Sequence, residues 1–185
     1  MATGASKFLA TTSERSDMNQ YWYSANSIET LVAEALECEG PVAFVSTPSL
    51  YLSIPESIRR ARDYRLLDFD QAFKVDPGFS FYDFRKPAEI DPELLQRFAG
   101  VVIDPPFITE EVWRAYAETS RALLLPGDSG RVLATTIAEN APLMLELFKA
   151  KPQRWQPSIP HLVYQYACYA NYDTVRHCCS CSTRA

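Results

Sequence analysis

The sequence predicts a doubly wound α/β fold, in which helices cover both faces of a mostly parallel β-sheet. Short apolar runs alternate along the chain with segments whose apolar residues recur at helical spacing, a pattern typical of consecutive strand–helix units. The 185 residues have the length of one domain, and a composition that is 47% hydrophobic and 22% charged indicates a globular protein. Two late segments, the second alternating with aromatics, indicate a closing antiparallel pair.

The first regular elements are a helix and a buried strand. From Ser27 on, apolar residues recur at i, i+3, i+4, i+7 and i+8, which predicts an amphipathic helix that Gly40 and Pro41 end. Residues 42–45 are a continuous apolar run and predict the first strand of the parallel sheet. The elements expected next are a helix over residues 50–63, which contains Pro55, and strands over residues 64–69 and 79–84.

The second half of the chain continues the alternation. Residues 100–103 are a short apolar run that predicts a buried strand. Thr109, Glu110 and Glu111 indicate the start of a helix, because threonine can cap a first turn and acids favour its N-terminal end. The other expected elements are a short helical connection over residues 87–98, helices over 112–125 and 138–148, a strand over 131–135, and the closing pair over 153–157 and 163–171.

The candidate site centres on Asp104-Pro105-Pro106-Phe107, directly after the strand of residues 100–103. Open α/β sheets bind ligands at the carboxyl ends of their strands. Asp104 and the Pro105 carbonyl are acceptors only, so they can take the N–H bonds of an amino group and leave its lone pair free for attack. The rigid prolines preorganise these acceptors, and Phe107 can contact a planar or an alkyl substrate. A strand-to-helix turn stiffened by proline fits the same residues equally well.

Asp104-Pro105-Pro106-Phe107 also resembles the DPPF motif of amino-group methyltransferases that use S-adenosylmethionine. Three further stretches, in matching order and spacing, resemble one branch of that group: Gln20-Tyr21-Trp22-Tyr23-Ser24, Val45-Ser46-Thr47-Pro48-Ser49-Leu50-Tyr51 and Cys168-Tyr169-Ala170-Asn171-Tyr172-Asp173. Together they resemble the elongation factor 1-alpha lysine methyltransferase family, formerly described as N6-adenine-specific DNA methyltransferases. The resemblance covers residues 18–173. It implies a Rossmann-like methyltransferase sheet, mostly parallel with an antiparallel C-terminal strand, and S-adenosyl-L-methionine as cofactor.

Two stretches are expected at the methionine end of that cofactor. Ser46 and Thr47 follow the first strand, where many methyltransferases carry a Gly-rich loop, and they could offer hydroxyls and amides. The related family resembles this chain in having few glycines there. The resemblance implies that Trp22, Tyr23 and Ser24 fold over the methionine part, although an aromatic staple beneath the first helix is the structural alternative.

Acids after the second and third strands are expected at the nucleoside end. An acid at the end of the second strand commonly binds ribose hydroxyls in nucleotide-binding α/β folds. Asp68 and Asp70 both qualify, and we prefer Asp70 because it lies beyond the strand end; a surface acid is the alternative. Asp83 could accept the adenine amino group, with Tyr82 or Phe84 stacked on the ring, although core packing explains these aromatics equally well.

Charge and composition bear on the partner. The formal net charge is −5, and no Lys/Arg cluster stands out; the densest basic run, residues 57–62, reads as a solvated helix face. Duplex-binding proteins normally present a basic surface to the phosphates. The acidic balance therefore argues against DNA and suits a basic protein partner, which by resemblance is elongation factor 1-alpha.

The chain is expected to have three parts: a flexible arm over residues 1–17, a methyltransferase domain over residues 18–175, and a Cys-rich tail over residues 176–185. The five cysteines and two histidines lack the spacing of a disulfide framework or a metal site. No stretch has the length and apolarity of a membrane span, and no signal peptide is evident, so a soluble, cytoplasmic protein is expected.

The sequence leaves three functions open. The preferred one is lysine methylation, with Asp104 orienting the substrate ammonium and water taking its proton, because no residue is an obvious general base. The alternatives are an adenine N6-methyltransferase, whose flipped base would stack on Phe107, and a catalytically silent methyltransferase fold that acts as a binding module.

Overall fold

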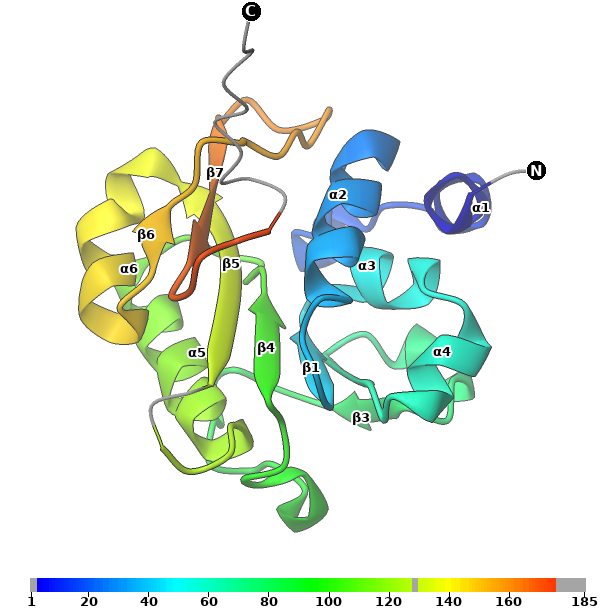
Figure 1. Cartoon of the computed structure of the whole chain (residues 1–185). Helices are drawn as coiled ribbons and strands as arrows, with labels where there is room; N and C mark the ends of the chain where they lie inside the picture. Colours follow the sequence, from blue (N-terminus) through cyan, green and yellow to red (C-terminus); the bar gives the residue numbers. More distant parts are fainter. Residues whose placement is uncertain (1–2, 128–129, 176–185) are drawn as a thin grey trace, which may run out of the picture.

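The structure is a computed structural model that describes residues 3–127 and 130–175. Within these residues it contains one seven-stranded sheet of strand order β3-β2-β1-β4-β5-β7-β6 (Figure 1). The strands β1 to β5 run parallel, whereas β7 pairs antiparallel with β5 and with β6. The strands are β1 Val42–Val45, β2 Arg65–Asp68, β3 Phe79–Phe81, β4 Gly100–Ile103, β5 Arg131–Ile137, β6 Lys151–Pro152 and β7 Tyr166–Ala170. The predicted fold class is confirmed.

Helices cover both faces of this sheet. One layer contains α1 Gly4–Thr11, α2 Ala25–Ala35, α3 Pro48–Ser53 and α4 Glu56–Ala61, and the other contains α5 Glu110–Leu123 and α6 Ala141–Phe148 (Figure 1). Four short 3-10 turns connect these elements: η1 Ser16–Met18, η2 Gln71–Val75, η3 Pro92–Leu94 and η4 Ala138–Asn140.

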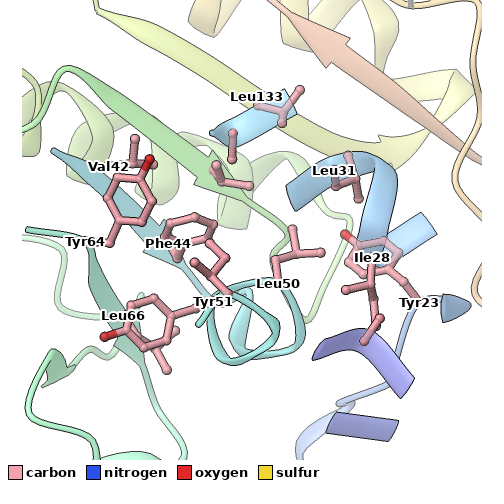
Figure 2. Close-up of a cluster of buried hydrophobic side chains, with 14 of the residues drawn as sticks. Tyr23, Ile28, Leu31, Val42, Phe44, Leu50, Tyr51, Tyr64, Leu66 and Leu133 are labelled. Atoms are coloured by element: carbon pink, nitrogen blue, oxygen red, sulfur yellow. The ribbon is translucent and has the colours of Figure 1, made fainter. Parts of the chain in front are cut away.

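The strand β1 lies between two apolar layers because its side chains alternate between the faces of the sheet. Phe44 packs with Leu50 and Tyr51 of α3 in one layer (Figure 2). Val45 belongs to the opposite layer, which contains Trp113 of α5. Burial on both faces explains why β1 and the neighbouring β4 are continuous apolar runs.

The N-terminal segment differs from the predicted flexible arm. Residues 4–11 form α1, which is capped by the Thr3 hydroxyl and buries Phe8 against Trp22, with ring centroids 5.1 Å apart. Gly4 permits close approach to α3, because a Cβ atom there would lie 1.9 Å from the Ser53 carbonyl oxygen. The helix is short and buries few side chains, so its apolar pattern is weak in the sequence.

Several helices and strands begin or end at other residues than predicted, because of a proline or because of pairing between strands. The helix predicted over residues 50–63 is divided at Pro55 into α3 and α4, since proline lacks the N–H that a continuous helix needs. The connection over residues 87–98 holds only η3, and the strand predicted over 153–157 is the short β6 instead. The strand β5 extends to Ile137, because β7 pairs with its residues 133–137.

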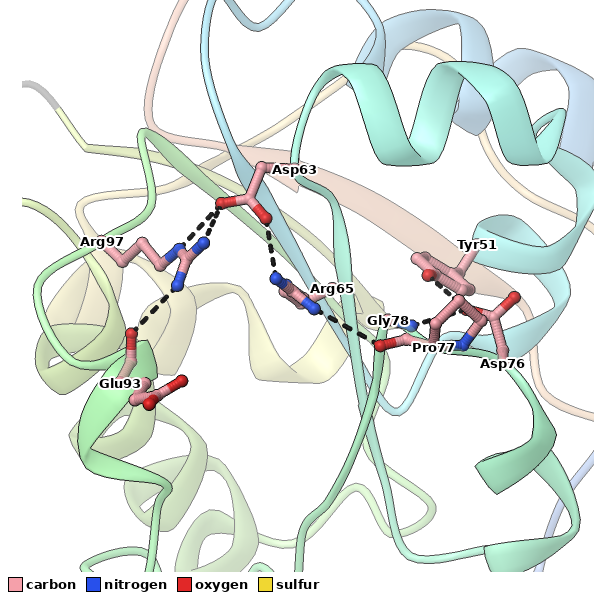
Figure 3. Close-up of polar contacts among 8 residues, drawn as sticks. All are labelled: Tyr51, Asp63, Arg65, Asp76, Pro77, Gly78, Glu93 and Arg97. Atoms are coloured by element: carbon pink, nitrogen blue, oxygen red, sulfur yellow. Dashed lines mark hydrogen bonds and ion pairs between the residues drawn. The ribbon is translucent and has the colours of Figure 1, made fainter.

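Charged side chains tie the amino ends of β2 and β3 to the neighbouring loops (Figure 3). Asp63 pairs with Arg97 at 2.5 Å and with Arg65 at 3.0 Å, and Arg65 also donates to the Pro77 carbonyl. These side chains are about one-third exposed, so each pair contributes little to stability. Arg59, in the basic run that was predicted to be solvated, is instead buried and bonded to Asp76.

Within residues 3–127 and 130–175, no helix has the length and apolar character of a membrane span, and no group of acids, cysteines and histidines could hold a metal ion. Cys38 and Cys168 are buried and free. The predicted Cys-rich tail of residues 176–185 lies outside the described residues.

Candidate functional site

A pocket of about 380 Å³ lies at the carboxyl ends of the parallel strands. The residues after β1, β2, β3 and β4 all contribute to its lining, together with the N-terminal residues 17–22. Its centre is the point where the strand order reverses between β1 and β4, the usual ligand site of an open α/β sheet. The predicted residues that line it are Trp22, Ser46, Asp83, Asp104, Pro105, Pro106 and Phe107.

Asp104 directly follows β4, and its carboxylate is held by hydroxyl groups. The Tyr23 hydroxyl donates to Asp104 Oδ2 at 2.5 Å and lies 2.5 Å from Thr135 Oγ1 of β5. Burial raises the pKa of Asp104 to about 7, and the hydrogen bond that Tyr23 donates opposes part of that shift. Among the described residues, no basic side chain contributes to this pKa, so the carboxylate is available to a cationic ligand.

The two prolines have different surroundings. Pro105 is buried, and among the described residues no donor is bonded to its carbonyl. The Pro106 carbonyl instead accepts a short hydrogen bond from Asn19 Nδ2. Asn19 ends η1 in the left-handed conformation, with φ of 52°. The N-terminal segment is thereby fastened to the turn, and the Pro105 carbonyl remains free for a ligand.

Aromatic rings form one wall of the pocket. Phe107 is 47% exposed, and its ring meets Phe84 edge-on at 6.1 Å. Phe84 in turn lies 6.2 Å from Tyr116 of α5. The exposed side of Phe107 can therefore contact a substrate that enters beside Asp104.

The turn after β1 adopts a left-handed conformation without a glycine. Ser46 adopts a positive φ of 56°, its N–H donates to the Leu67 carbonyl, and its hydroxyl lies 2.6 Å from that of Tyr116. This left-handed conformation costs a non-glycine residue about 1 kcal/mol or more. Thr47 precedes α3 and is buried away from the pocket lining, so the two predicted residues are not brought together.

Of the two acids at the end of β2, the structure brings Asp68 into the pocket lining and leaves Asp70 outside it. Asp70 instead caps η2 by accepting from the Ala72 N–H, and it pairs with Arg15 at 3.5 Å. Asp68 accepts the Asp70 N–H at 2.8 Å, and burial raises its pKa to about 7. Because β2 ends at Asp68, Asp70 lies beyond the strand end as expected, but outside the pocket lining.

Asp83 lines the pocket and accepts hydrogen bonds from Arg85, whose Nε and Nη2 donate to it at 2.8 and 2.7 Å. These hydrogen bonds lower the pKa of Asp83, so it is an ionised acceptor. The Arg85 guanidinium also lies 5.4 Å from the ring centre of Phe69, which lines the pocket next to Asp68. Phe69 is 45% exposed and could receive a flat ring on its face.

The residues Trp22, Tyr23 and Ser24 have three separate roles. Trp22 lines the pocket while its indole N–H donates to the Thr12 carbonyl at 3.0 Å. Tyr23 is turned toward Asp104, and Ser24 caps α2 by accepting the Ser27 N–H. Only Trp22 therefore faces the space in which the predicted cofactor contact would occur.

Sequence reasoning missed several site residues. Asn19, Tyr116 and Tyr166 line the pocket, and Thr135 supports it from β5. The sequence gives little sign of these four residues, because each belongs to a segment whose residues are also explained by a turn, a helix or a strand. Tyr166 does begin the alternating aromatic strand β7, whose position beside β5 brings it to the pocket.

The strand order, the antiparallel β7 and a pocket at the carboxyl strand ends are those of the Rossmann-like methyltransferase fold. A solved structure with the same fold is the E. cuniculi Mtq2–Trm112 complex, which is 15% identical and gives a TM-score of 0.52 over 81% of this chain and 96% of that chain. Residues 14–174 match the model of a family described as "Probable N6-adenine methyltransferase". The chain belongs to this family.

Curated relatives bear a different activity in their names. EEF1A lysine methyltransferase 1 of Mus musculus is 30% identical over 171 residues, which is 89% of this chain and 78% of the relative. Protein-lysine N-methyltransferase EFM5 of Saccharomyces cerevisiae is 30% identical over 123 residues, which is 62% of this chain and 50% of the relative. The predicted family resemblance is confirmed.

Proposed function

We propose that this protein is an S-adenosyl-L-methionine-dependent protein-lysine N-methyltransferase and that its substrate is elongation factor 1-alpha. The observation that carries the proposal is the pair formed by the Asp104 carboxylate and the free Pro105 carbonyl at the pocket. Both groups accept hydrogen bonds, and neither has a basic side chain as partner among the described residues. Such a pair suits an amino group that must be held while its lone pair points elsewhere.

The charge of the pocket fits this cofactor. Four carboxylates line it, those of Asp17, Asp68, Asp83 and Asp104, against one basic side chain among the described lining residues, Arg85. An acidic, partly enclosed pocket attracts cations, and both the methyl sulfonium of the cofactor and the ammonium of lysine are cationic. When bound, the cofactor supplies an electrophilic methyl group.

The residues that we assign to the cofactor follow from their places in the pocket. Asp68, the last residue of β2, suits the ribose hydroxyls, and Asp83 suits the adenine amino group, with Phe69 beside the ring. Trp22 and the Ser46 turn would contact the methionine end. Asp70 and Ser24 cap η2 and α2, and Thr47 lies outside the pocket lining, so we leave these three residues out of this set.

Asp104 and Pro105 would hold the lysine nitrogen, and Phe107 would contact its alkyl chain. The rigid turn and the Asn19 bond to Pro106 keep these groups in place before the substrate arrives. Exclusion of water by the aromatic wall strengthens each electrostatic contact.

Lysine is favoured over adenine by the relatives' names and by charge. The relatives are named lysine methyltransferases, although the family description names adenine. The net charge of −5 and the acidic pocket oppose the approach of a phosphate backbone, whereas they attract a lysine side chain. We place this reaction in the cytoplasm, together with the translation machinery that the proposed substrate serves.

The proposal is tested with purified protein and methyl-labelled cofactor offered to elongation factor 1-alpha and to duplex DNA in parallel. We expect label on the protein, loss of transfer in Asp104→Ala with cofactor affinity retained, and normal transfer in the exposed control Glu111→Gln. Label on adenine alone would refute the lysine assignment. Absence of cofactor binding in calorimetry would instead support a silent binding module.

A further inference from the structure

Asp104, Tyr23 and Thr135 form a chain of hydrogen-bonded oxygens that begins at the pocket and ends on β5. Its two links, from Asp104 Oδ2 to the Tyr23 hydroxyl and from that hydroxyl to Thr135 Oγ1, both measure 2.5 Å. Tyr23 and Thr135 are almost completely buried, whereas Asp104 retains partial exposure at the pocket. The chain is therefore closed to solvent at one end and open to a ligand at the other.

We propose that Asp104 is the proton acceptor for the substrate ammonium and that Tyr23 and Thr135 are positioning residues that direct this proton to Oδ1. The inference rests on the proposed lysine methylation. It replaces the expectation, drawn from the sequence, that water removes the proton.

The direction of the chain follows from the number of protons available. A tyrosine hydroxyl has one proton, and that of Tyr23 is donated to Asp104 Oδ2. Thr135 must then supply the proton of the second link. With Oδ2 occupied, Oδ1 is the oxygen that remains for a proton from the pocket.

The groups that face Asp104 leave it without a competing cation. Tyr23 precedes α2, Tyr116 belongs to α5 and Tyr166 to β7, and burial raises the pKa of each, so all three remain neutral. The acids Asp17, Asp68 and Asp83 line the same pocket, and the basic Arg85 is paired with Asp83. The pKa of Asp104, raised to about 7 by burial, suits a proton acceptor at neutral pH.

The proton and electron pairs balance as follows. One ammonium proton moves from the lysine nitrogen to Asp104 Oδ1. The neutral amine then rotates about its carbon–nitrogen bond, so that its two N–H groups face Asp104 and the Pro105 carbonyl and its lone pair faces the methyl group. The amine lone pair forms the new bond to the methyl carbon, and the electron pair of the broken carbon–sulfur bond stays on sulfur. The product is a methylated ammonium, and Asp104 returns its proton to water when the product leaves.

The first test observes the carboxyl group without cofactor or substrate. Infrared titration of the wild type should show protonated carboxyl absorption with a midpoint of about 7, to which Asp68 also contributes and from which Asp104→Asn removes the Asp104 part. Tyr23→Phe should raise that midpoint by about one to two pH units, because one hydrogen bond to the ionised form is lost. Thr135→Val should raise it less, and Thr135→Ser should restore it. Asp68→Asn is the control, because Asp68 titrates in the same range and its loss should leave the Asp104 band in place.

The second test measures the pH dependence of kcat/KM for lysine methylation. The acidic limb should move upward in Tyr23→Phe by the shift seen in the infrared titration. In Asp104→Asn the rate should be low at pH 7 and rise about tenfold per pH unit toward the lysine pKa of ~10.4, as the free amine forms in water.

The outcomes separate this inference from the proposed function. An active wild type whose Asp104→Asn variant keeps the wild-type pH profile would overturn the acceptor role alone. An unshifted midpoint in both Tyr23→Phe and Thr135→Val would overturn the positioning roles. A wild type that transfers no methyl group to lysine at any pH would overturn the proposed function and the acceptor role with it.

Discussion

Replacement of Asp68 by asparagine should change how the stability of the protein depends on pH. Asp68 is 6% exposed at the end of β2, and burial raises its pKa to about 7 from an ordinary value of ~3.9. A carboxyl whose pKa is raised on folding destabilises the folded state increasingly as pH rises through this window. The effect levels off above the folded pKa. Asparagine has no charge, and its side-chain oxygen can still accept the Asp70 N–H.

The magnitude follows from the shift in pKa. A difference of roughly three units corresponds to about 4 kcal/mol once the group is ionised, of which about 2–3 kcal/mol arises between pH 5 and pH 8. Hydration and relaxation at the pocket reduce this, so we expect an effect of about 1–2 kcal/mol. From pH 5 to pH 8, the free energy of unfolding should therefore fall by about 1–2 kcal/mol more in the wild type than in Asp68→Asn.

Urea unfolding of both proteins without cofactor, at pH 5 and at pH 8, measures this difference. The comparison across pH removes any constant cost of placing an amide in the buried site. Equal pH dependence in the two proteins would refute the argument that Asp68 is a strained, buried carboxylate. If Asp68 binds ribose, the variant should in addition bind the cofactor at least tenfold more weakly in calorimetry.

Three further substitutions test other parts of the site and the fold. Phe107→Ala should lower kcat/KM for lysine methylation about tenfold with cofactor affinity unchanged, because the wall for the substrate chain is removed; a larger loss of cofactor affinity would contradict this. Asn19→Ala should weaken cofactor binding about fivefold in calorimetry, since one hydrogen bond that fastens the N-terminal segment is lost, and unchanged affinity would count against that role. Gly4→Ala should lower the unfolding free energy by about 1–3 kcal/mol in urea, because the added Cβ meets the Ser53 carbonyl; the exposed Lys7→Ala is its control, and equal stability of the two variants would exclude the clash.

The layout of the sheet could be predicted because its strands are apolar runs between turn signals. β1 and β4 are buried on both faces, so their composition alone indicates them. α1 was missed because its burial depends on Gly4 approaching Ser53 and on Phe8 meeting Trp22. Such long-range contacts leave no local pattern in the sequence.

The part of the site that a rigid motif fixes could be predicted from the sequence. The part that depends on the exact residue at which a strand ends was harder to predict. The acid–proline turn lies at the pocket because it directly follows β4. The choice between Asp68 and Asp70 depended on the last residue of β2, and strand ends are the least certain part of a sequence prediction. The direction of the Tyr23 side chain, toward Asp104, required the packing of α2 against the sheet.

Methyl transfer at this site depends most on how the acid–proline turn holds an amine. A crystal structure with bound S-adenosylhomocysteine and a lysine peptide of elongation factor 1-alpha tests this directly. We expect the lysine nitrogen within hydrogen-bonding distance of both Asp104 and the Pro105 carbonyl, with its free side directed at the sulfur. A lysine bound elsewhere, or a cofactor too far from Asp104 for methyl transfer, would contradict the account.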